Sequence, residues 1–153
     1  MPSSVTQRCD FDGQKLRLRL NLQIPGDPST ISPVVQGVLQ IASEMKCADG
    51  KEFEIETGLR EALANAIRHG CGNNPSRIVE CSVLCDESRG MLIVVRDSGP
   101  GFDPGQLPSP TVGQNIFSTH GRGIYLINQL MDEVRFERGG TEIHMLKKPP
   151  SPS

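Results

Sequence analysis

The chain has 153 residues, with 16 Lys and Arg against 18 Asp and Glu, and a formal net charge of −2. This length predicts one domain whose core can fold without metals or disulfides. With an aromatic content of 4% and no Trp, the composition argues against a surface that stacks single-stranded nucleic acid, and the charge argues against a generally basic DNA-binding protein.

Alternating apolar residues and turn signals divide the chain into five strands and three helices. Residues 15–24 alternate apolar and polar side chains, which is typical of a half-buried strand, and the Pro25-Gly26-Asp27-Pro28 run ends it. Ser29 or Thr30 is placed to cap the helix that follows. In chain order, we predict a strand over 15–24, helices over 29–47 and 52–69, strands over 78–85 and 91–96, a helix over 123–131, and strands over 134–137 and 142–146.

The order of these elements predicts an α/β (α+β) two-layer sandwich rather than a Rossmann fold. Strands outnumber helices and most neighbouring strands form hairpins, so we expect a mixed, largely antiparallel sheet covered by helices on one face. Residues 98–120 hold eight Gly and Pro residues, and a loop this long is usually functional. We expect one domain over 15–147, a flexible N-terminus over 1–14 and a disordered tail over 148–153.

Three polar residues share one side of the helix predicted over 52–69. Glu61, Asn65 and His69 recur every four residues, and each step turns about 40° beyond a full turn and rises about 6 Å. The apolar stripe beside them, which predicts the core-facing side of the helix, consists of Leu59, Leu63, Ala66 and Ile67. The polar line fits either one wall of a cleft or an ordinary solvated helix face.

An acidic residue and two glycines follow the strand predicted over 91–96. The run is Asp97-Ser98-Gly99-Pro100-Gly101, in which glycines let the backbone approach a flat ligand without a Cβ in the way. The carboxylate of Asp97 could accept a hydrogen bond from an exocyclic amine. An ordinary Asp-Ser-Gly turn explains the same letters equally well.

Two glycines flank Arg122 where the third helix is predicted to begin. Backbone N–H groups near Gly121 and Gly123 would be free to meet an anion, and the helix dipole would add to the attraction. A single Gly-x-Gly is weak evidence, because a flexible loop that enters a helix has the same composition.

Taken in order, the three runs resemble the nucleotide site of the GHKL ATPases, which have a Bergerat-type, histidine-kinase-like fold. The resemblance spans roughly residues 15–147. It is strongest to the small anti-sigma factor serine kinases of the RsbW and SpoIIAB type. The run Glu61–Gly70 is similar to their E-A-x-x-N-A-x-x-H-G box, and residues 121–134 are similar to their G-x-G-x-x-L-I and L-M-D-E-V runs. The pairs Gly140-Thr141 and Lys147-Lys148 also fit.

The resemblance implies a site for ATP and Mg²⁺. Asn65 would hold the ion through its side-chain oxygen, which is the kind of ligand that a hard cation prefers. Asp97 would accept from the adenine amino group, Glu61 would orient and deprotonate the nucleophile, and His69 would either contact the nucleotide or order the helix end. Residues 102–120 would form the ATP lid. The other cofactor-binding residues would be Gly99 and Gly101 at the adenine and Gly121, Arg122 and Gly123 at the phosphates.

One position departs from the family pattern. Some members carry an Arg just ahead of the second glycine pair, where Thr119 and His120 stand in this chain. Arg122 lies between the glycines, so the basic group at the terminal phosphate stays unassigned. Because neither a phosphoacceptor helix nor a transducer domain flanks the match, we do not expect a complete sensor histidine kinase, a gyrase B subunit or MutL.

The resemblance implies functions of different kinds. In the first, the chain sequesters a sigma factor and phosphorylates a serine of a STAS-type anti-anti-sigma protein, without direct contact to nucleic acid or a membrane. In the alternative, it is a nucleotide-dependent switch that activates a PP2C-type phosphatase, and a third reading is a kinase for another STAS protein that acts independently of a sigma factor. Glu61 favours a kinase over a switch. Family members commonly dimerise, so a homodimer is an expectation.

The sequence also predicts a cytoplasmic protein. No apolar run approaches the roughly 20 residues of a membrane-spanning helix, and the first 14 residues contain no apolar segment typical of a secretory signal. The five cysteines include no CxxC pair. Cys81 and Cys85 fall on one predicted strand about 13 Å apart, too far to bridge within it. We therefore expect reduced packing cysteines rather than zinc ligands or disulfides.

Overall fold

A computed structural model describes residues 16–47, 50–86, 88–99 and 119–149. The flexible N-terminus, the lid over 102–120 and the disordered tail are predictions that lie wholly or mostly outside these residues. The elements in chain order are β1 (Leu16–Pro25), the 3₁₀ turn η2 (Pro28–Thr30), α2 (Ile31–Glu44), α3 (Glu52–Asn65), the π turn η3 (Ala66–Gly70), β2 (Ile78–Asp86), β3 (Gly90–Arg96), α4 (Thr119–Leu130), β4 (Glu133–Glu137), the 3₁₀ turn η6 (Arg138–Gly140) and β5 (Glu142–Lys147).

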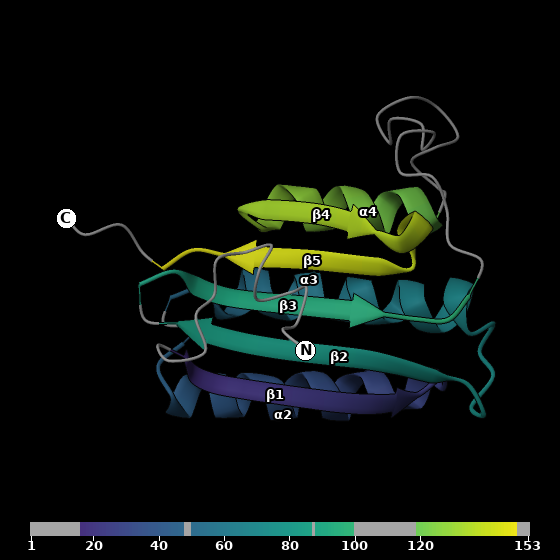
Figure 1. The fold of residues 1–153 in the computed structure, drawn as a ribbon, viewed down its shortest axis with the longest axis horizontal. Coiled ribbons are helices and arrows are strands. Elements are labelled where there is room, and N and C mark those ends of the chain that lie inside the picture. Colours follow the sequence, from purple (N-terminus) through teal and green to yellow (C-terminus); the bar gives the residue numbers. More distant parts are fainter. Residues whose placement is uncertain (1–15, 48–49, 87, 100–118, 150–153) are drawn as a thin grey trace.

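The described strands form one five-stranded sheet in the order β1-β2-β3-β5-β4. Each neighbouring pair is antiparallel. The helices lie behind the sheet in Figure 1, with α2 behind β1 and α3 behind the centre. This arrangement confirms the predicted two-layer α/β sandwich. The described sheet is antiparallel throughout rather than mixed, because each strand pairs with its neighbour in the opposite direction. In the described residues, no helix is long and apolar enough to cross a membrane.

Alternation along the strands explains where the core lies. On β1, Ile24 is buried and the alternate leucines before it pack against the core between sheet and helices. The central strand β3 is buried on both faces, as its uninterrupted apolar run indicates. Its odd-numbered residues join the main core, whereas Leu92 and Val94 form a smaller cluster with Leu84 and Leu146 on the face away from the helices.

The first helical segment begins differently from the prediction. A 3₁₀ turn precedes α2, and its cap is Asp27, whose Oδ1 accepts from the N–H of Ser29 at 2.9 Å. Thr30 makes no side-chain capping bond, and its hydroxyl donates to the carbonyl of Asp27 at 2.7 Å instead. Thr30 is thus the N-cap residue of α2, as predicted, but it makes no side-chain capping bond there, and the side-chain cap of the preceding turn is Asp27.

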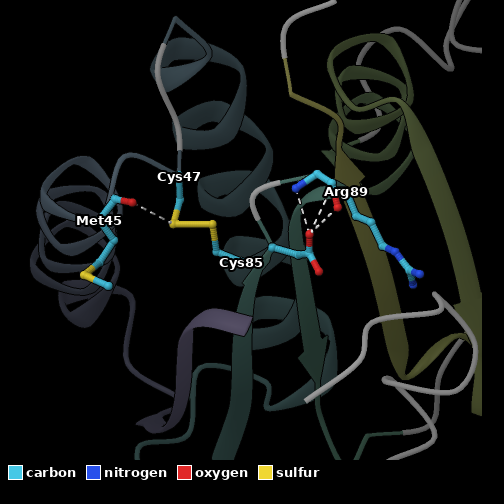
Figure 2. The surroundings of a disulfide bond; sticks show 6 residues. Met45, Cys47, Cys85 and Arg89 are labelled. Atoms are coloured by element: carbon cyan, nitrogen blue, oxygen red, sulfur yellow. Dashed lines mark hydrogen bonds between the residues drawn. A yellow bond between two sulfur atoms is a disulfide. The ribbon is translucent and has the colours of Figure 1, made fainter. Parts of the chain in front are cut away.

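The end of α2 turns the chain back toward the sheet. Lys46 adopts a left-handed conformation with φ of 58°. Its N–H donates to the carbonyl of Ser43 at 3.0 Å, and the N–H of Cys47 donates to the carbonyl of Ala42 at 2.8 Å. This pair of bonds is a Schellman-type cap. It brings Cys47 to β2, where it forms a disulfide with Cys85 across a Cα–Cα distance of 6.0 Å (Figure 2).

This disulfide corrects the expectation of reduced packing cysteines. As predicted, Cys85 does not pair with Cys81 on its own strand. Its partner is Cys47, which follows a helix end 38 residues earlier in the sequence. Such a contact follows from the packing of α2 against the sheet and has no local sequence signal. In the described part of the chain, Cys71 and Cys81 are free and buried, in agreement with the prediction.

The third helix, α4, begins at Thr119, four residues before the predicted start, and ends at Leu130. Its C-terminus is held by the last strand, β5: the ammonium of Lys147 donates to the carbonyl of Leu130. A cation at this end of a helix is favourable because of the helix dipole. The N–H of Lys148 donates to the carboxylate of Asp132 at 2.6 Å, which fixes the turn between α4 and β4.

Replacing Gly37 with alanine should stabilise the protein. Gly37 is exposed in the middle of α2, and an added Cβ would meet no atom within 4 Å. Alanine in a helix interior is favoured over glycine by roughly 0.5–1 kcal/mol. We expect the Tm to rise by about 1–4 °C in a chain of this size. Thermal unfolding followed by circular dichroism tests this, and an unchanged or lower Tm would contradict the open helical environment of Gly37.

Candidate functional site

A pocket lies where the C-terminal end of α3 meets the C-terminal end of β3. The start of α4 and the hairpin between β4 and β5 complete its walls. Its lining residues are Ala62, Asn65, Ala66, His69, Gly70, Val95, Asp97, Ile124, Phe136, Gly140, Thr141 and Ile143. Polar groups from two predicted runs, 61–70 and 97–101, therefore converge on one mainly apolar cavity, which is the usual character of a small-molecule site.

The helix that carries Asn65 and His69 changes geometry between them. It is α-helical to Asn65 and then closes a π turn, in which the N–H of Cys71 donates to the carbonyl of Ala66 at 2.9 Å. Such turns are frequent at functional sites. Partial burial, aided by the charge of Arg68, lowers the pKa of His69, so the imidazole is neutral near pH 7. Asn65 and His69 both line the pocket, as predicted for a cleft wall.

Asp97 stands at the end of β3 with its carboxylate partly buried. Its backbone N–H donates to the carbonyl of Thr141 at 2.9 Å, which ties the strand end to β5. Its Oδ1 accepts from the N–H of Gly99 at 2.8 Å. Burial raises the pKa of Asp97, and the bond from Gly99 opposes that rise. Asp97 therefore brings an acceptor to the pocket wall, at the cost of partly desolvating a carboxylate.

Two glycines let the helix end and the strand end come together. A Cβ on Gly70 would lie 2.2 Å from Cγ of Asp97, and a Cβ on Gly99 would lie 2.4 Å from the carbonyl oxygen of Gly70. A side chain at Gly70 would therefore displace the Asp97 carboxylate, and one at Gly99 would displace the backbone of Gly70. In this structure, the close approach at Gly99 is thus between two backbones. Gly101, the second glycine of the predicted run, lies outside the described residues.

The predicted phosphate run opens α4 beside Asn65. A Cβ on Gly123 would lie 3.2 Å from Nδ2 of Asn65, so the helix start and the amide are in contact range. Because α4 begins at Thr119, Gly121 and Arg122 fall among the first four residues, whose N–H groups have no partner within a helix. Gly123 is the fifth residue, one position beyond them.

Glu61 does not line the pocket around Asp97. It is half-buried on α3, one helical turn and about 6 Å before Asn65. Glu61 thus lies near Asn65 without contributing to the pocket wall. In the described part of the chain, no group of three or more His, Cys, Asp or Glu residues could hold a metal ion.

The sequence did not single out the apolar walls of the pocket. Val95, Phe136 and Ile143 come from three strands that become neighbours only through the sheet order β3-β5-β4. Alternation could assign each one to the helix-facing side of its strand. It could not bring them to the same end of the sheet. Thr141, which the resemblance mentions only as part of a fitting pair, lines the pocket and holds Asp97 through its carbonyl.

An antiparallel sheet backed by helices, with an Asp at a strand end facing an Asn on a helix, is the architecture of a histidine-kinase-like ATPase domain. The model of that family, the histidine kinase-like ATPase domain, matches residues 24–147. The chain belongs to this family, and its resemblance to the RsbW/SpoIIAB-like members is confirmed.

Two relatives illustrate the similarity. An anti-sigma F factor of Bacillus cytotoxicus is 36% identical over 100 residues, which cover 61% of this chain and 67% of that protein. The serine-protein kinase RsbW of Bacillus subtilis is 28% identical over 137 residues, which cover 84% of each chain.

Replacing Gly70 with alanine should damage this site. The new Cβ would overlap the carboxylate of Asp97, so either the carboxylate or the π turn has to move. Overpacking of this kind costs about 1–3 kcal/mol, or roughly 3–10 °C in Tm. We also expect ATP affinity to fall at least about tenfold, since Asp97 is displaced. Calorimetry and thermal unfolding measure both effects, with Gly37→Ala as the matched control that leaves affinity unchanged.

Proposed function

We propose that this protein is an ATP-binding anti-sigma factor and protein serine kinase. The observation that carries the proposal is the convergence of Asn65, His69 and Asp97 on one pocket. The names of the two relatives, an anti-sigma F factor and a serine-protein kinase, agree with it. The ATPase domain family supports ATP as the nucleotide.

The adenine end of ATP lies between the strand end and the π turn. Asp97 uses its free acceptor capacity for the adenine amino group, while its Oδ1 remains with the N–H of Gly99. The apolar walls, Val95 and Ile143, suit a flat aromatic base. The phosphates then extend toward the start of α4, where the free N–H groups near Gly121 and Arg122 attract negative charge.

A Mg²⁺ ion fits this arrangement. The amide oxygen of Asn65 is a hard ligand of the type that Mg²⁺ accepts, and the ion commonly takes its other ligands from phosphates and water. When bound, Mg²⁺ neutralises charge on the transferring phosphoryl group. The closeness of the Gly123 backbone to the Asn65 amide, where an added Cβ would lie 3.2 Å from Nδ2, supports a ligand role for Asn65 beside the proposed phosphate site.

The proposed reaction transfers the γ-phosphoryl group of ATP to a serine of a STAS-type anti-anti-sigma protein. The serine oxygen forms a bond to the γ-phosphorus, the bond from that phosphorus to the bridging oxygen breaks, and ADP leaves. The carboxylate of Glu61 takes the proton from the serine hydroxyl. Its place one turn before Asn65 suits this role, because the base must lie near the terminal phosphate rather than the adenine.

The proposed partners are a sigma factor, which the protein sequesters, and its STAS-type antagonist. A homodimer is the proposed assembly. The test is a pull-down with the tagged full chain from its native host, with and without ATP, followed by mass spectrometry. Recovery of a sigma factor, together with phosphoserine on a recovered STAS protein, supports the proposal. Recovery of a PP2C-type phosphatase without a sigma factor or phosphoserine would assign the protein to the switches instead.

A further inference from the structure

The disulfide ties the end of α2 to the sheet, at a distance from the nucleotide pocket. Cys85 pairs in register with Met91 at the start of β3, whereas Asp97 follows the end of β3. Six residues of extended strand separate these two positions, which is about 20 Å. The two cysteines are 38 residues apart in the sequence, and the segment between them contains the whole of α3 and the π turn. The bond therefore constrains the helical layer from the end opposite the pocket.

The two cysteines differ in their exposure to solvent. Cys85 is 2% exposed, whereas Cys47, at the end of the α2 cap, is half-buried. Thiol–disulfide exchange requires a thiolate to reach one sulfur of the bond. Cys47 is the more exposed residue of the pair, so we expect an incoming thiolate to form a mixed disulfide with Cys47 while Cys85 leaves.

The burial of Cys85 keeps its sulfur beside Cys47 after the bond opens. Cys85 is 2% exposed, and its Cα lies 6.0 Å from that of Cys47. The Cys85 thiol can therefore attack a mixed disulfide at Cys47 intramolecularly and expel a monothiol. A dithiol escapes this reversal, because its second thiol attacks the mixed disulfide intramolecularly.

We infer that Cys47 and Cys85 form a thiol–disulfide exchange site for a soluble dithiol, and that the bond is a reversible clamp on the α2–α3 connection. The dithiol thiolate bonds to the Cys47 sulfur and the S–S bond breaks toward Cys85, which takes a proton. The second thiol of the reductant then bonds to the first, and Cys47 leaves as a thiol. Two electrons and two protons pass to the protein, and the dithiol becomes a cyclic disulfide.

Reduction opens the clamp without changing the nucleotide pocket. Apolar packing of Val35, Val38 and Ala42 still holds α2 in the reduced chain. The loss is the covalent constraint over 38 residues, for which chain entropy predicts a fall in Tm of about 10 °C. The amides of the α2 cap, Ser43 to Cys47, exchange faster with solvent, while ATP affinity stays the same.

The experiment compares the oxidised and reduced full chain. Non-reducing peptide mapping first establishes that a Cys47–Cys85 peptide is present after oxidation. Thermal unfolding is then measured with increasing dithiothreitol, and with glutathione at the same thiol concentration. The expected result is a fall in Tm with the dithiol and little change with the monothiol. Equal reduction by glutathione would overturn the dithiol assignment, and the absence of the linked peptide would overturn the site.

Two variants provide matched controls. Cys47→Ser should melt like the reduced wild type and should not respond to dithiothreitol, whereas Cys81→Ala should keep the dithiol-dependent difference in Tm. Unfolding of the wild type on reduction would show a permanent structural bond and overturn the reversible clamp. ATP binding that is lost only on reduction would overturn the separation of clamp and pocket. Absence of ATP binding in both states would instead contradict the proposed function and leave the clamp standing.

Discussion

Replacing Glu61 with alanine should slow phosphoryl transfer to the cognate STAS protein by about 10²–10⁴-fold, the usual contribution of a general base. The affinity for ATP should not change, because Glu61 lies outside the residues that line the pocket around Asp97. Binding of the sigma factor should also persist. Single-turnover transfer from γ-labelled ATP measures the rate, and calorimetry measures the affinity.

Glu54→Ala is the matched control for this variant. Both glutamates are half-buried on α3, but Glu54 lies about 16 Å along the helix from Asn65. We therefore expect the Glu54 variant to phosphorylate at the wild-type rate. An equal loss in both variants would indicate damage to α3 rather than loss of a base. A wild-type rate in Glu61→Ala would contradict the role proposed for this carboxylate.

Most of the fold could be predicted because its elements carry local signals. Alternation marks β1, the uninterrupted apolar run marks the twice-buried strand β3, and Gly70 marks the end of the second helical segment. The polar line on α3 was ambiguous by itself, since a solvated face has the same spacing. The structure resolves it for Asn65 and His69, which line the pocket opposite Asp97.

The features that the sequence did not predict arise from contacts between distant segments. The residues of the π turn after Asn65 would suit an ordinary helix end equally well. Its geometry occurs where Gly70 packs closely against Asp97. The disulfide requires the turn after α2 to lie beside β2, which no spacing within the sequence encodes. The early start of α4 at Thr119 likewise has no clear capping signal in the sequence, and Gly121 and Gly123 favour a later start.

Asp97→Asn should weaken ATP binding by roughly ten- to a hundredfold while the protein stays folded. The asparagine oxygen can keep the bond from the N–H of Gly99, which now goes to Oδ1 of Asp97 at 2.8 Å. The remaining amide group is then a donor and faces the adenine amino group, another donor. An unsatisfied buried polar group of this kind costs about 1–3 kcal/mol. Titration calorimetry of both proteins with ATP and Mg²⁺ measures the loss, and equal affinities would remove Asp97 from the adenine site.

The pH dependence of binding provides an independent test of the same carboxylate. Burial raises the pKa of Asp97 above its usual 3.8, so the folded protein holds this proton more tightly than the unfolded chain. The contribution of Asp97 to stability therefore falls as the pH rises through the window that begins near 3.8, and replacing it with asparagine should not lower the Tm at pH 7.

The adenine amine has the opposite preference, since it favours the ionised form of Asp97. ATP affinity should thus be constant above the pKa of Asp97 and should decline as the pH falls through it, with proton release on binding in that window. Asp97→Asn should lack this part of the pH dependence. A wild-type profile that coincides with that of the variant after scaling would mean that Asp97 does not accept a hydrogen bond from the nucleotide.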